Sequence, residues 1–312
     1  MQKLQTEEQM VLQLKNVKII TTEKKQLKSN HKYLILGANG QLGKQFAKDL
    51  HARNESVIAP DEKDCDITSI DILSQFIDSV KPTVIINCAA YNAVDLAEQQ
   101  SDIATLINTT AVKNIATLCN EMKIFFVHYS SDYVFDGTKG NLYNENDVPN
   151  PLNVYGKSKR AGEEAVLSLG SKYLLFRTSW VFGNGTQNFI HKMLQWSQKN
   201  PVLKLTADEV SVPTSTIDLV DITLQSIDKE LTGLYHLTNS DYASRYEWGR
   251  YIAKQLSLKS TIIPVPMSAF PSPAQRPLFS AMSNEQLQKD LGFTIPDWRD
   301  AIQRFLIEYP VQ

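Results

Sequence analysis

From residue 31 onward, short apolar runs of strand length alternate with longer stretches of helical periodicity. This alternation restricts the fold more than any other feature, because it predicts parallel strands joined by helices that cover both faces of one sheet. Right-handed crossovers then give a doubly wound α/β arrangement. The predicted strands are Lys32–Leu36, Ser56–Ala59, Thr83–Asn87, Ile124–Ser130 and Tyr173–Thr178.

The first predicted strand runs directly into a glycine-rich loop, Gly37–Gly43, and a helix is expected over Lys44–Leu50. Glycines here let the chain turn tightly and let backbone N–H groups approach a pyrophosphate at the helix N-terminus. The spacing is GxxGxxG rather than GxGxxG, and a purely structural turn is the alternative. We expect a Rossmann-like domain that holds a dinucleotide through Gly37, Asn39, Gly40, Gln41, Leu42 and Gly43.

Further cofactor contacts are expected where the second and third strands end. Asp61 lies where an acidic side chain would bond the ribose of NADH, but Lys63 could instead meet the 2′-phosphate of NADPH, so both cofactors stay open. Asp66 is a candidate for the adenine edge or for a helix N-cap. Ala89 and Ala90 have the small side chains that a loop against a bound cofactor needs.

The expected catalytic residues are Ser131, Tyr155 and Lys159. The last two are four positions apart at the start of a predicted helix and share one face, so the ammonium can lie beside the phenol and the cofactor ribose. Its charge is expected to lower the pKa of Tyr155 toward neutrality, which suits a general acid. Ser131 leaves the carboxyl edge of the sheet, where its hydroxyl can polarise a substrate carbonyl.

The composition excludes several classes of partner. The 312 residues have a formal net charge of -2, so no global field attracts nucleic acid or an anionic membrane. No run of about 18 apolar residues predicts a membrane span, and no secretory signal is recognisable. Cys65, Cys88 and Cys119 have neither metal-ligand nor CxxC spacing and fit buried thiols. We therefore expect a cytoplasmic protein.

The chain divides into three regions by pattern. Residues 1–30 are rich in Gln, Glu, Lys and Thr and form an N-terminal extension of unknown role. Residues 31–182 are the expected dinucleotide-binding domain, rejoined by part of 205–238. Residues 183–312 mainly form a smaller, irregular α+β substrate-binding lobe, because prolines become frequent and the helical stretches there are short.

Several segments after Asn30 resemble the extended short-chain dehydrogenases, and within them the dTDP-4-dehydrorhamnose reductase family. The resemblance implies hydride transfer from NAD(P)H to C4 of dTDP-4-dehydro-L-rhamnose, giving dTDP-L-rhamnose for cell-envelope polysaccharide. It implies that Tyr155 donates the proton, Lys159 tunes Tyr155 and holds the ribose, and Ser131 bonds the carbonyl oxygen. The matching segments are Gly37–Gly43, Asn87–Asp95, His128–Gly137, Pro151–Lys159 and Arg177–Gly183, with Arg276, Pro277 and Ser280.

The same resemblance places Asn92, Val94, Tyr133 and Trp180 against the sugar or the nucleotide, with simple core packing as the alternative for Trp180. Arg276 is a candidate for the diphosphate, because a guanidinium meets phosphate oxygens bidentately, or it forms a surface ion pair.

Some features depart from the family pattern. Ser131 replaces a common Thr but keeps the hydroxyl, and Tyr91-Asn92 replaces a frequent His-Thr pair, which leaves the sugar open. Some members bind magnesium through glutamates at a dimer interface; those residues have no match here, so no metal is expected, while a homodimer stays open.

Two other functions share these motifs. A nucleotide-sugar 4-epimerase or 4,6-dehydratase uses the same scaffold, although a dehydratase commonly has Asp-Glu where Asp132-Tyr133 stands. The non-catalytic regulatory subunit of methionine adenosyltransferase also resembles this family, including the stretch 130–138. Outside the motifs, Arg177 is expected to brace the sheet, and His128, His191 and His236 are expected to be structural.

Overall fold

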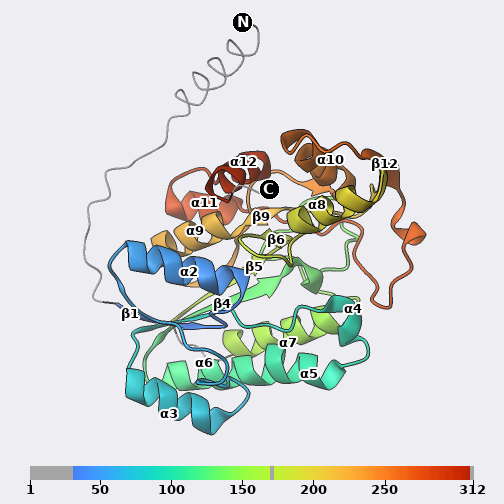
Figure 1. The fold of residues 1–312 in the computed structure, drawn as a ribbon. Helices are drawn as coiled ribbons and strands as arrows, with labels where there is room; N and C mark the ends of the chain where they lie inside the picture. The colour runs from blue at the N-terminus through green and yellow to red at the C-terminus, as the bar shows by residue number, and fades with distance from the viewer. Residues whose placement is uncertain (1–30, 169–171, 310–312) are drawn as a thin grey trace, which may run out of the picture. The chain divides into compact units, whose positions relative to one another are not determined.

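The computed structural model describes residues 31–168 and 172–309, so the expected extension 1–30 lies outside the described part. Within that part, one parallel sheet has the strand order β10-β5-β4-β3-β1-β2 (Figure 1). The chain crosses from β2 back past β1 to β3, so the winding direction reverses between β1 and β3, and the doubly wound prediction is confirmed. The strands are β1 Lys32–Leu36, β2 Ser56–Ile58, β3 Val84–Asn87, β4 Phe125–Ser131, β5 Tyr173–Thr178 and β10 Gly233–His236.

The strands form where the sequence has apolar runs that are buried on both faces. All four residues of β3 are buried, as are the last four of β1. The five predicted strands agree with the observed ones to within one residue at each end. The first helix, α2 (Gln41–Ala52), begins three residues earlier than expected and therefore includes part of the glycine loop.

Helices cover the sheet on both faces (Figure 1). One face packs against α2, α9 and α11, and the other against α3, α6 and α7. Shorter elements, α4, α5 and a π-helical turn η1, join β3 to α6. The bounds are α3 Ile70–Val80, α4 Val94–Ala97, α5 Ser101–Thr105, η1 Leu106–Thr110, α6 Ala111–Glu121, α7 Val154–Leu167, α9 Thr216–Asp228 and α11 Glu285–Leu291.

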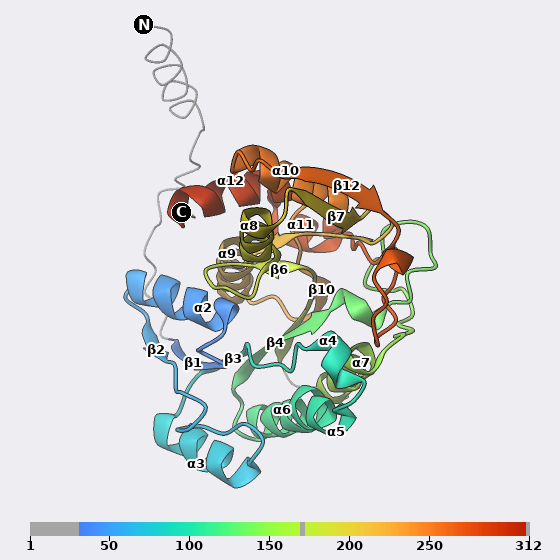
Figure 2. The same cartoon turned by 45° about the vertical axis from the view of Figure 1, so that its right-hand side comes forward.

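A second layer of short elements lies beyond the carboxyl ends of the main strands (Figure 2). Here β7 pairs with β12, β6 with β9, and β8 with β11, around a core that includes Phe182, Trp248 and Phe305. The bounds are β6 Val181–Phe182, α8 Phe189–Lys199, β7 Val202–Thr206, β8 Val210–Ser211, β9 Thr214–Ser215, β11 Ala243–Ser244, α10 Arg245–Gln255, β12 Thr261–Val265 and α12 Trp298–Glu308.

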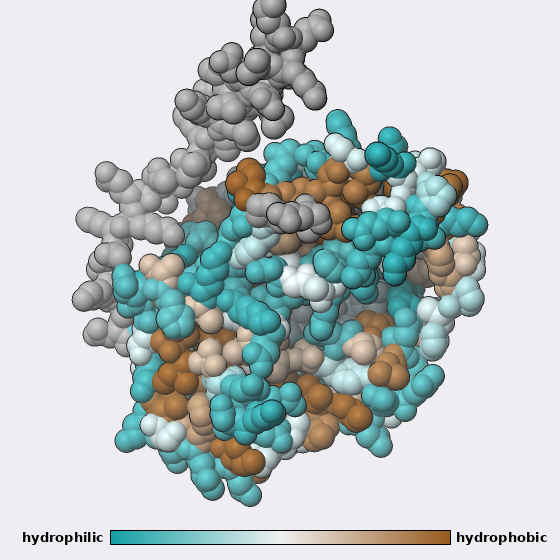
Figure 3. All heavy atoms as spheres, viewed as in Figure 1, coloured by the Kyte–Doolittle hydropathy of each residue, from teal (hydrophilic) through white to brown (hydrophobic). Residues whose placement is uncertain are grey.

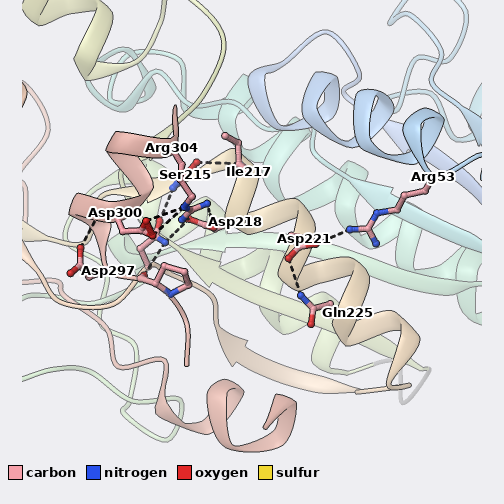
Figure 4. A network of polar contacts seen from close by, with 11 residues as sticks. Arg53, Ser215, Ile217, Asp218, Asp221, Gln225, Asp297, Asp300 and Arg304 are labelled. Carbon is pink, nitrogen blue, oxygen red and sulfur yellow. Dashed lines mark hydrogen bonds and ion pairs between the residues drawn. The ribbon is translucent and has the colours of Figure 1, made fainter. Parts of the chain in front are cut away.

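Ion pairs connect α9 with α12 and with the end of α2 (Figure 4). Arg304 of α12 meets both carboxylate oxygens of Asp218 on α9 at 2.9 Å and also pairs with Asp300 at 3.1 Å. Arg53, which follows α2, pairs with Asp221 of α9 at 2.7 Å. The bidentate guanidinium–carboxylate contact of Arg304 is directional and fixes how α12 sits on α9, and the single contact of Arg53 ties the end of α2 to α9.

The surface drawn in Figure 3 is mainly hydrophilic, with apolar side chains in separate patches. None of the helices in the described ranges is long and apolar enough to cross a membrane.

Candidate active site

The glycine loop requires its glycines for close packing. A Cβ at Gly37, whose φ is +75°, would lie 2.5 Å from the backbone nitrogen of Ala89, and one at Gly43 would lie 2.4 Å from the Gly37 carbonyl oxygen. A Cβ at Gly40 would meet only the Gly37 oxygen, at 3.4 Å. Gly40 is also the N-cap of α2 and offers no side chain to the helix N–H groups, so these donors suit an anionic ligand.

The other loop residues differ in exposure. Asn39 is exposed, and Leu42 packs partly into the core beneath the sheet. The Gln41 amide oxygen accepts a hydrogen bond of 3.2 Å from Asn188, which caps α8 in the second layer. The glycine loop is therefore tied to the lobe expected to hold the substrate.

The expected ribose and adenine contacts lie beyond β2. Asp61 and Lys63 are both exposed there, so either can meet a ligand. The carboxylate of Asp66 accepts hydrogen bonds from the backbone nitrogen and hydroxyl of Thr68, at 2.8 and 2.7 Å. The N-cap of α3 is Ser69, so the N-cap alternative for Asp66 is wrong.

Ala89 and Ala90 follow β3 in the loop that faces the glycine loop. The Ala89 backbone nitrogen donates to the side chain of Asn87 at 3.1 Å, which turns the chain out of the sheet. The small side chains of this loop thus lie where its backbone closely approaches Gly37 of the glycine loop.

Ser131, Tyr155 and Lys159 are all buried at the carboxyl end of β4, with exposed fractions of 7%, 9% and 2%. The hydroxyls of Ser131 and Tyr155 are hydrogen-bonded. Lys159 donates to the Tyr129 carbonyl at 2.6 Å. The glycine at position 156 lets α7 pack closely against the segment after β4, because a Cβ there would lie 2.3 Å from the Tyr133 carbonyl oxygen. The topology thus brings the three expected catalytic residues together.

The expected lowering of the Tyr155 pKa is wrong for this structure. Burial raises the pKa of Tyr155 to about 12, and the contact with Ser131 only partly opposes it. Burial also lowers the pKa of Lys159 to about 8, although the carboxylate of Glu163 acts in the opposite direction. The carboxylate of Asp132 adds to the rise in the Tyr155 pKa, and the hydrogen bond of the Lys159 ammonium goes to the backbone of β4.

Asn108 was not recognised in the sequence, yet it organises the site from the π-helical turn η1. Its side chain is buried and makes hydrogen bonds of 2.9 and 3.0 Å to the backbone of Tyr91 and one of 3.0 Å to the Ser158 hydroxyl. It therefore fixes the loop after β3 against α7, next to Lys159. No sequence pattern predicts a π turn, although such turns are frequent at functional sites.

The expected sugar contacts divide into two groups. Val94 and Tyr133 pack in one cluster with Tyr155, and the rings of Tyr133 and Tyr155 meet edge to face at 5.8 Å. Asn92 is exposed on the loop that leads to Val94. Val94 and Tyr133 therefore border Tyr155, whereas Trp180 lines a separate pocket.

That pocket has a volume of about 750 Å³ and is lined by residues of the second layer. Trp180 stacks on Trp248 with ring centroids 5.5 Å apart, and the guanidinium of Arg245 lies 3.6 Å above the Trp180 ring. Lys192 and Lys204 add two further cations to the lining. Only Trp180 was singled out from the sequence, because the other residues come from distant segments without a shared motif.

Arg276 forms the ion pair that was the alternative to a diphosphate contact. Its guanidinium lies 2.7 Å from the carboxylate of Asp95 on α4, and this contact lowers the pKa of Asp95. The Arg276 side chain is 21% exposed and the Asp95 side chain 44%. The pair therefore remains open to solvent and to a competing anion.

Most of the residues expected to be structural have core environments, but His191 is half-buried and lies 3.1 Å from the Gln195 side chain on α8. Arg177 makes two hydrogen bonds of 2.8 Å to Glu163, both side chains being buried, so its bracing role is confirmed. His128 and His236 are fully buried. Cys65 and Cys119 are buried free thiols, and Cys88 is half-buried.

A parallel sheet with this switch point, a glycine loop and a buried Ser, Tyr and Lys define a nicotinamide-dependent oxidoreductase of the short-chain dehydrogenase class. Residues 31–311 match the family model described as RmlD substrate binding domain. A dTDP-4-dehydrorhamnose reductase of Burkholderia thailandensis is 37% identical over 290 residues, which cover 87% of this chain and 96% of the relative. The chain belongs to the dTDP-4-dehydrorhamnose reductase family.

Solved structures agree with this assignment. A dTDP-4-dehydrorhamnose reductase of Clostridium acetobutylicum superposes with a TM-score of 0.87 at 36% identity, covering 90% of this chain and 100% of the other. One from Bacillus anthracis, solved in complex with NADP, gives a TM-score of 0.86 at 35% identity with the same coverage. A Thermus thermophilus UDP-glucose 4-epimerase, 17% identical with a TM-score of 0.76, shares the fold and covers 90% of this chain.

Proposed function

We propose that this chain reduces the C4 keto group of dTDP-4-dehydro-L-rhamnose to dTDP-L-rhamnose with NADPH or NADH, which supplies a precursor of cell-envelope polysaccharide. The observation that carries the proposal is the convergence of Ser131, Tyr155 and Lys159 at the end of β4, in a chain whose relatives bear the name of this reductase.

The residues at the carboxyl ends of β1 and β3 fit a dinucleotide. The uncapped N-terminus of α2 and the open space at Gly40 suit a pyrophosphate, and Asp61 or Lys63 is within the region expected for the ribose. A bound reduced nicotinamide supplies the hydride. Tyr155 and Lys159 would contact its ribose. Asp66 would contact its adenine, and Ala89 and Ala90 would form the loop that lies against the cofactor. The remaining contacts are assigned to Gly37, Asn39, Gly40, Gln41, Leu42 and Gly43.

Tyr155 donates a proton to the oxygen formed at C4, and Ser131 holds that oxygen by a hydrogen bond. Both side chains are buried, so the proton passes from Tyr155 to the substrate without competition from bulk water. Lys159 places a positive charge beside the site where the Tyr155 phenolate forms, and this stabilises the deprotonated tyrosine after transfer.

The second layer would hold the nucleotide part of the substrate. Aromatic walls formed by Trp180 and Phe189 suit a base, and Arg245 and Lys192 suit phosphate oxygens. Asn92, Val94 and Tyr133 would meet the sugar, and Arg276 would exchange Asp95 for the diphosphate. In this scheme residues 31–182, with part of 205–238, bind the dinucleotide, and 183–312 mainly bind the substrate.

The test follows NADPH and NADH oxidation at the nicotinamide absorbance, with dTDP-4-dehydro-L-rhamnose generated in the same tube. Stoichiometric oxidation with formation of dTDP-L-rhamnose is expected, and the relative rates choose the cofactor. An epimerase would return the hydride and consume no added cofactor. Cofactor binding without oxidation, together with co-purification of a synthetase, would instead favour the regulatory role.

We also propose a cytoplasmic homodimer. The free cysteines suit a reducing compartment, and most soluble oligomers are symmetric dimers. Light scattering of the purified chain tests the assembly, and a monomeric mass at working concentrations contradicts it.

A further inference from the structure

Asp132, the residue after Ser131, is a buried carboxylate that binds three serine hydroxyls. It is 2% exposed. One of its oxygens accepts from Ser131 at 3.1 Å, and the other accepts from Ser211 at 2.8 Å and from Ser280 at 2.5 Å. No ion pair to Asp132 occurs among the residues described; Arg245 acts on it only through space.

Another buried carboxylate nearby is stabilised differently. Glu163 is fully buried but has the guanidinium of Arg177 at 2.8 Å, and that contact helps to lower its pKa. Burial raises the pKa of Asp132 to about 6, and the serine hydroxyls only partly oppose this. A carboxylate without a cation in contact is costly to bury, so its place beside Ser131 calls for a functional reason.

The three serines come from three parts of the chain. Ser131 ends β4, and Ser211 lies in β8, which pairs with β11 directly before Arg245. Ser280 follows the Arg276 segment and donates its backbone N–H to the Val210 carbonyl at 2.9 Å. Asp132 therefore connects the catalytic strand with both segments that are proposed to hold the substrate.

The geometry fixes the oxygen of Ser131. Its hydroxyl donates to the Asp132 carboxylate at 3.1 Å and accepts from the backbone nitrogen of Tyr133 at 3.2 Å. With the oxygen held there, rotation about the Cβ–Oγ bond alone turns the proton from Asp132 to a substrate carbonyl.

We propose that Asp132 is the positioning residue of the Ser131 hydroxyl and that, through Ser211 and Ser280, it sets the substrate lobe in register with this hydroxyl. The inference rests on the proposed reductase function, in which Ser131 meets the carbonyl oxygen.

A double-mutant cycle tests this role. In Asp132→Asn the amide has one acceptor oxygen in place of two, so it cannot accept all three hydroxyls. We expect kcat to fall about 10- to 100-fold with the Kd for NADPH unchanged, and Asp132→Asn to add less than about threefold in a Ser131→Ala background. A merely structural Asp132 would lower kcat by the same factor in both backgrounds, and that result overturns the inference.

Asp136→Asn is the matched control. Asp136 lies on the same segment and accepts hydrogen bonds from Thr138, Tyr143 and Asn150, but none from Ser131. It should leave kcat unchanged in both backgrounds.

Two further measurements keep the inference testable. If Asp132→Asn does not fold, Ser280→Ala replaces it in the cycle. The effect of Ser280→Ala on kcat should also be largely lost in the Ser131→Ala background, and equal factors in both backgrounds reject the proposal.

If the wild type is inactive, the proposed function fails, and the cycle is measured from denaturant midpoints. Coupling between positions 131 and 132 then supports the positioning contact, and additive midpoints contradict it.

Discussion

The two halves of the candidate site are built in different ways. At the sheet edge, the glycine loop follows β1, and Ser131 and Tyr155 lie at the end of β4, with β3 between these two parallel strands. In the second-layer pocket, Trp180 and Arg245 meet across 65 positions of sequence and stack at 3.6 Å. The proposed function therefore places chemistry where parallel topology forces residues together, and recognition where distant segments pack. Substitutions at the sheet edge should change kcat or cofactor affinity, whereas those in the pocket should change KM.

The largest effect is expected for Tyr155→Phe. Removing the hydroxyl removes the proton donor, so kcat should fall by about 10² to 10⁴ while the Kd for NADPH changes little. Steady-state kinetics and titration of the cofactor measure the two quantities. Tyr251→Phe, which removes a hydroxyl from α10 in the second layer, should leave kcat unchanged. Unchanged turnover in Tyr155→Phe would remove this residue from the mechanism.

Gly37→Ala should mainly damage cofactor binding. Its Cβ would enter the backbone of Ala89 at 2.5 Å, whereas Gly140, with a similar φ of +70°, has no atom within 4 Å of an added Cβ. Both substitutions carry the left-handed backbone strain of about 1 kcal/mol, but only Gly37→Ala must also move the loop.

Calorimetric titration with NADPH should show at least a tenfold weaker Kd for Gly37→Ala, an energy of about 1.4 kcal/mol, and no change for Gly140→Ala. Equal loss of affinity in both variants would show that the close approach to Ala89 does not shape the cofactor site.

The sheet-edge half could be predicted from the sequence because its signals are local. Strand-length apolar runs predicted five strands of the main sheet, and the order of Ser131 on a strand and of Tyr155 and Lys159 on the following helix identified these three residues. The pocket could not be predicted, since nothing local marks Arg245 as the neighbour of Trp180.

The pKa of Tyr155 was also predicted in the wrong direction. The spacing of Tyr155 and Lys159 indicates charge proximity, but it carries no information about how deeply the phenol is buried. Burial depends on packing of the whole lobe. The same limit hid Asp132 and Asn108, whose roles depend on partners from other elements.

Arg245→Gln should raise KM for the nucleotide sugar about tenfold with kcat nearly constant, because it removes a cation–π contact and a charge from the proposed nucleotide pocket. Arg299→Gln is the matched control. Arg299 lies 4.2 Å from the Trp298 ring and pairs with Asp241, but its side chain is 43% exposed and does not line the pocket. A kcat effect in Arg245→Gln without a KM effect would contradict the division between the two halves.

We also expect a pH dependence with opposite signs for stability and activity. Burial lowers the pKa of Lys159 to about 8 from an ordinary value of 10.5, so the folded state releases this proton before the unfolded state does. The cost of the buried charge is fully present below pH 8 and disappears as the pH rises from about 8 to 10.5, so stability increases there. Activity needs the ammonium, so kcat/KM should halve near pH 8 and fall about tenfold per pH unit above it.

Thermal midpoints and kcat/KM measured between pH 7 and pH 10 test both signs on the same samples. Lys159→Met should abolish this component of the alkaline gain in stability, whereas Lys157→Met, an exposed position on the same helix, should retain it. An alkaline gain of equal size in wild type and Lys159→Met would assign it to another group. The sheet-edge half would then have no buried ammonium that titrates in this range. It would no longer differ in this respect from the pocket, where the cationic side chains line an open cavity.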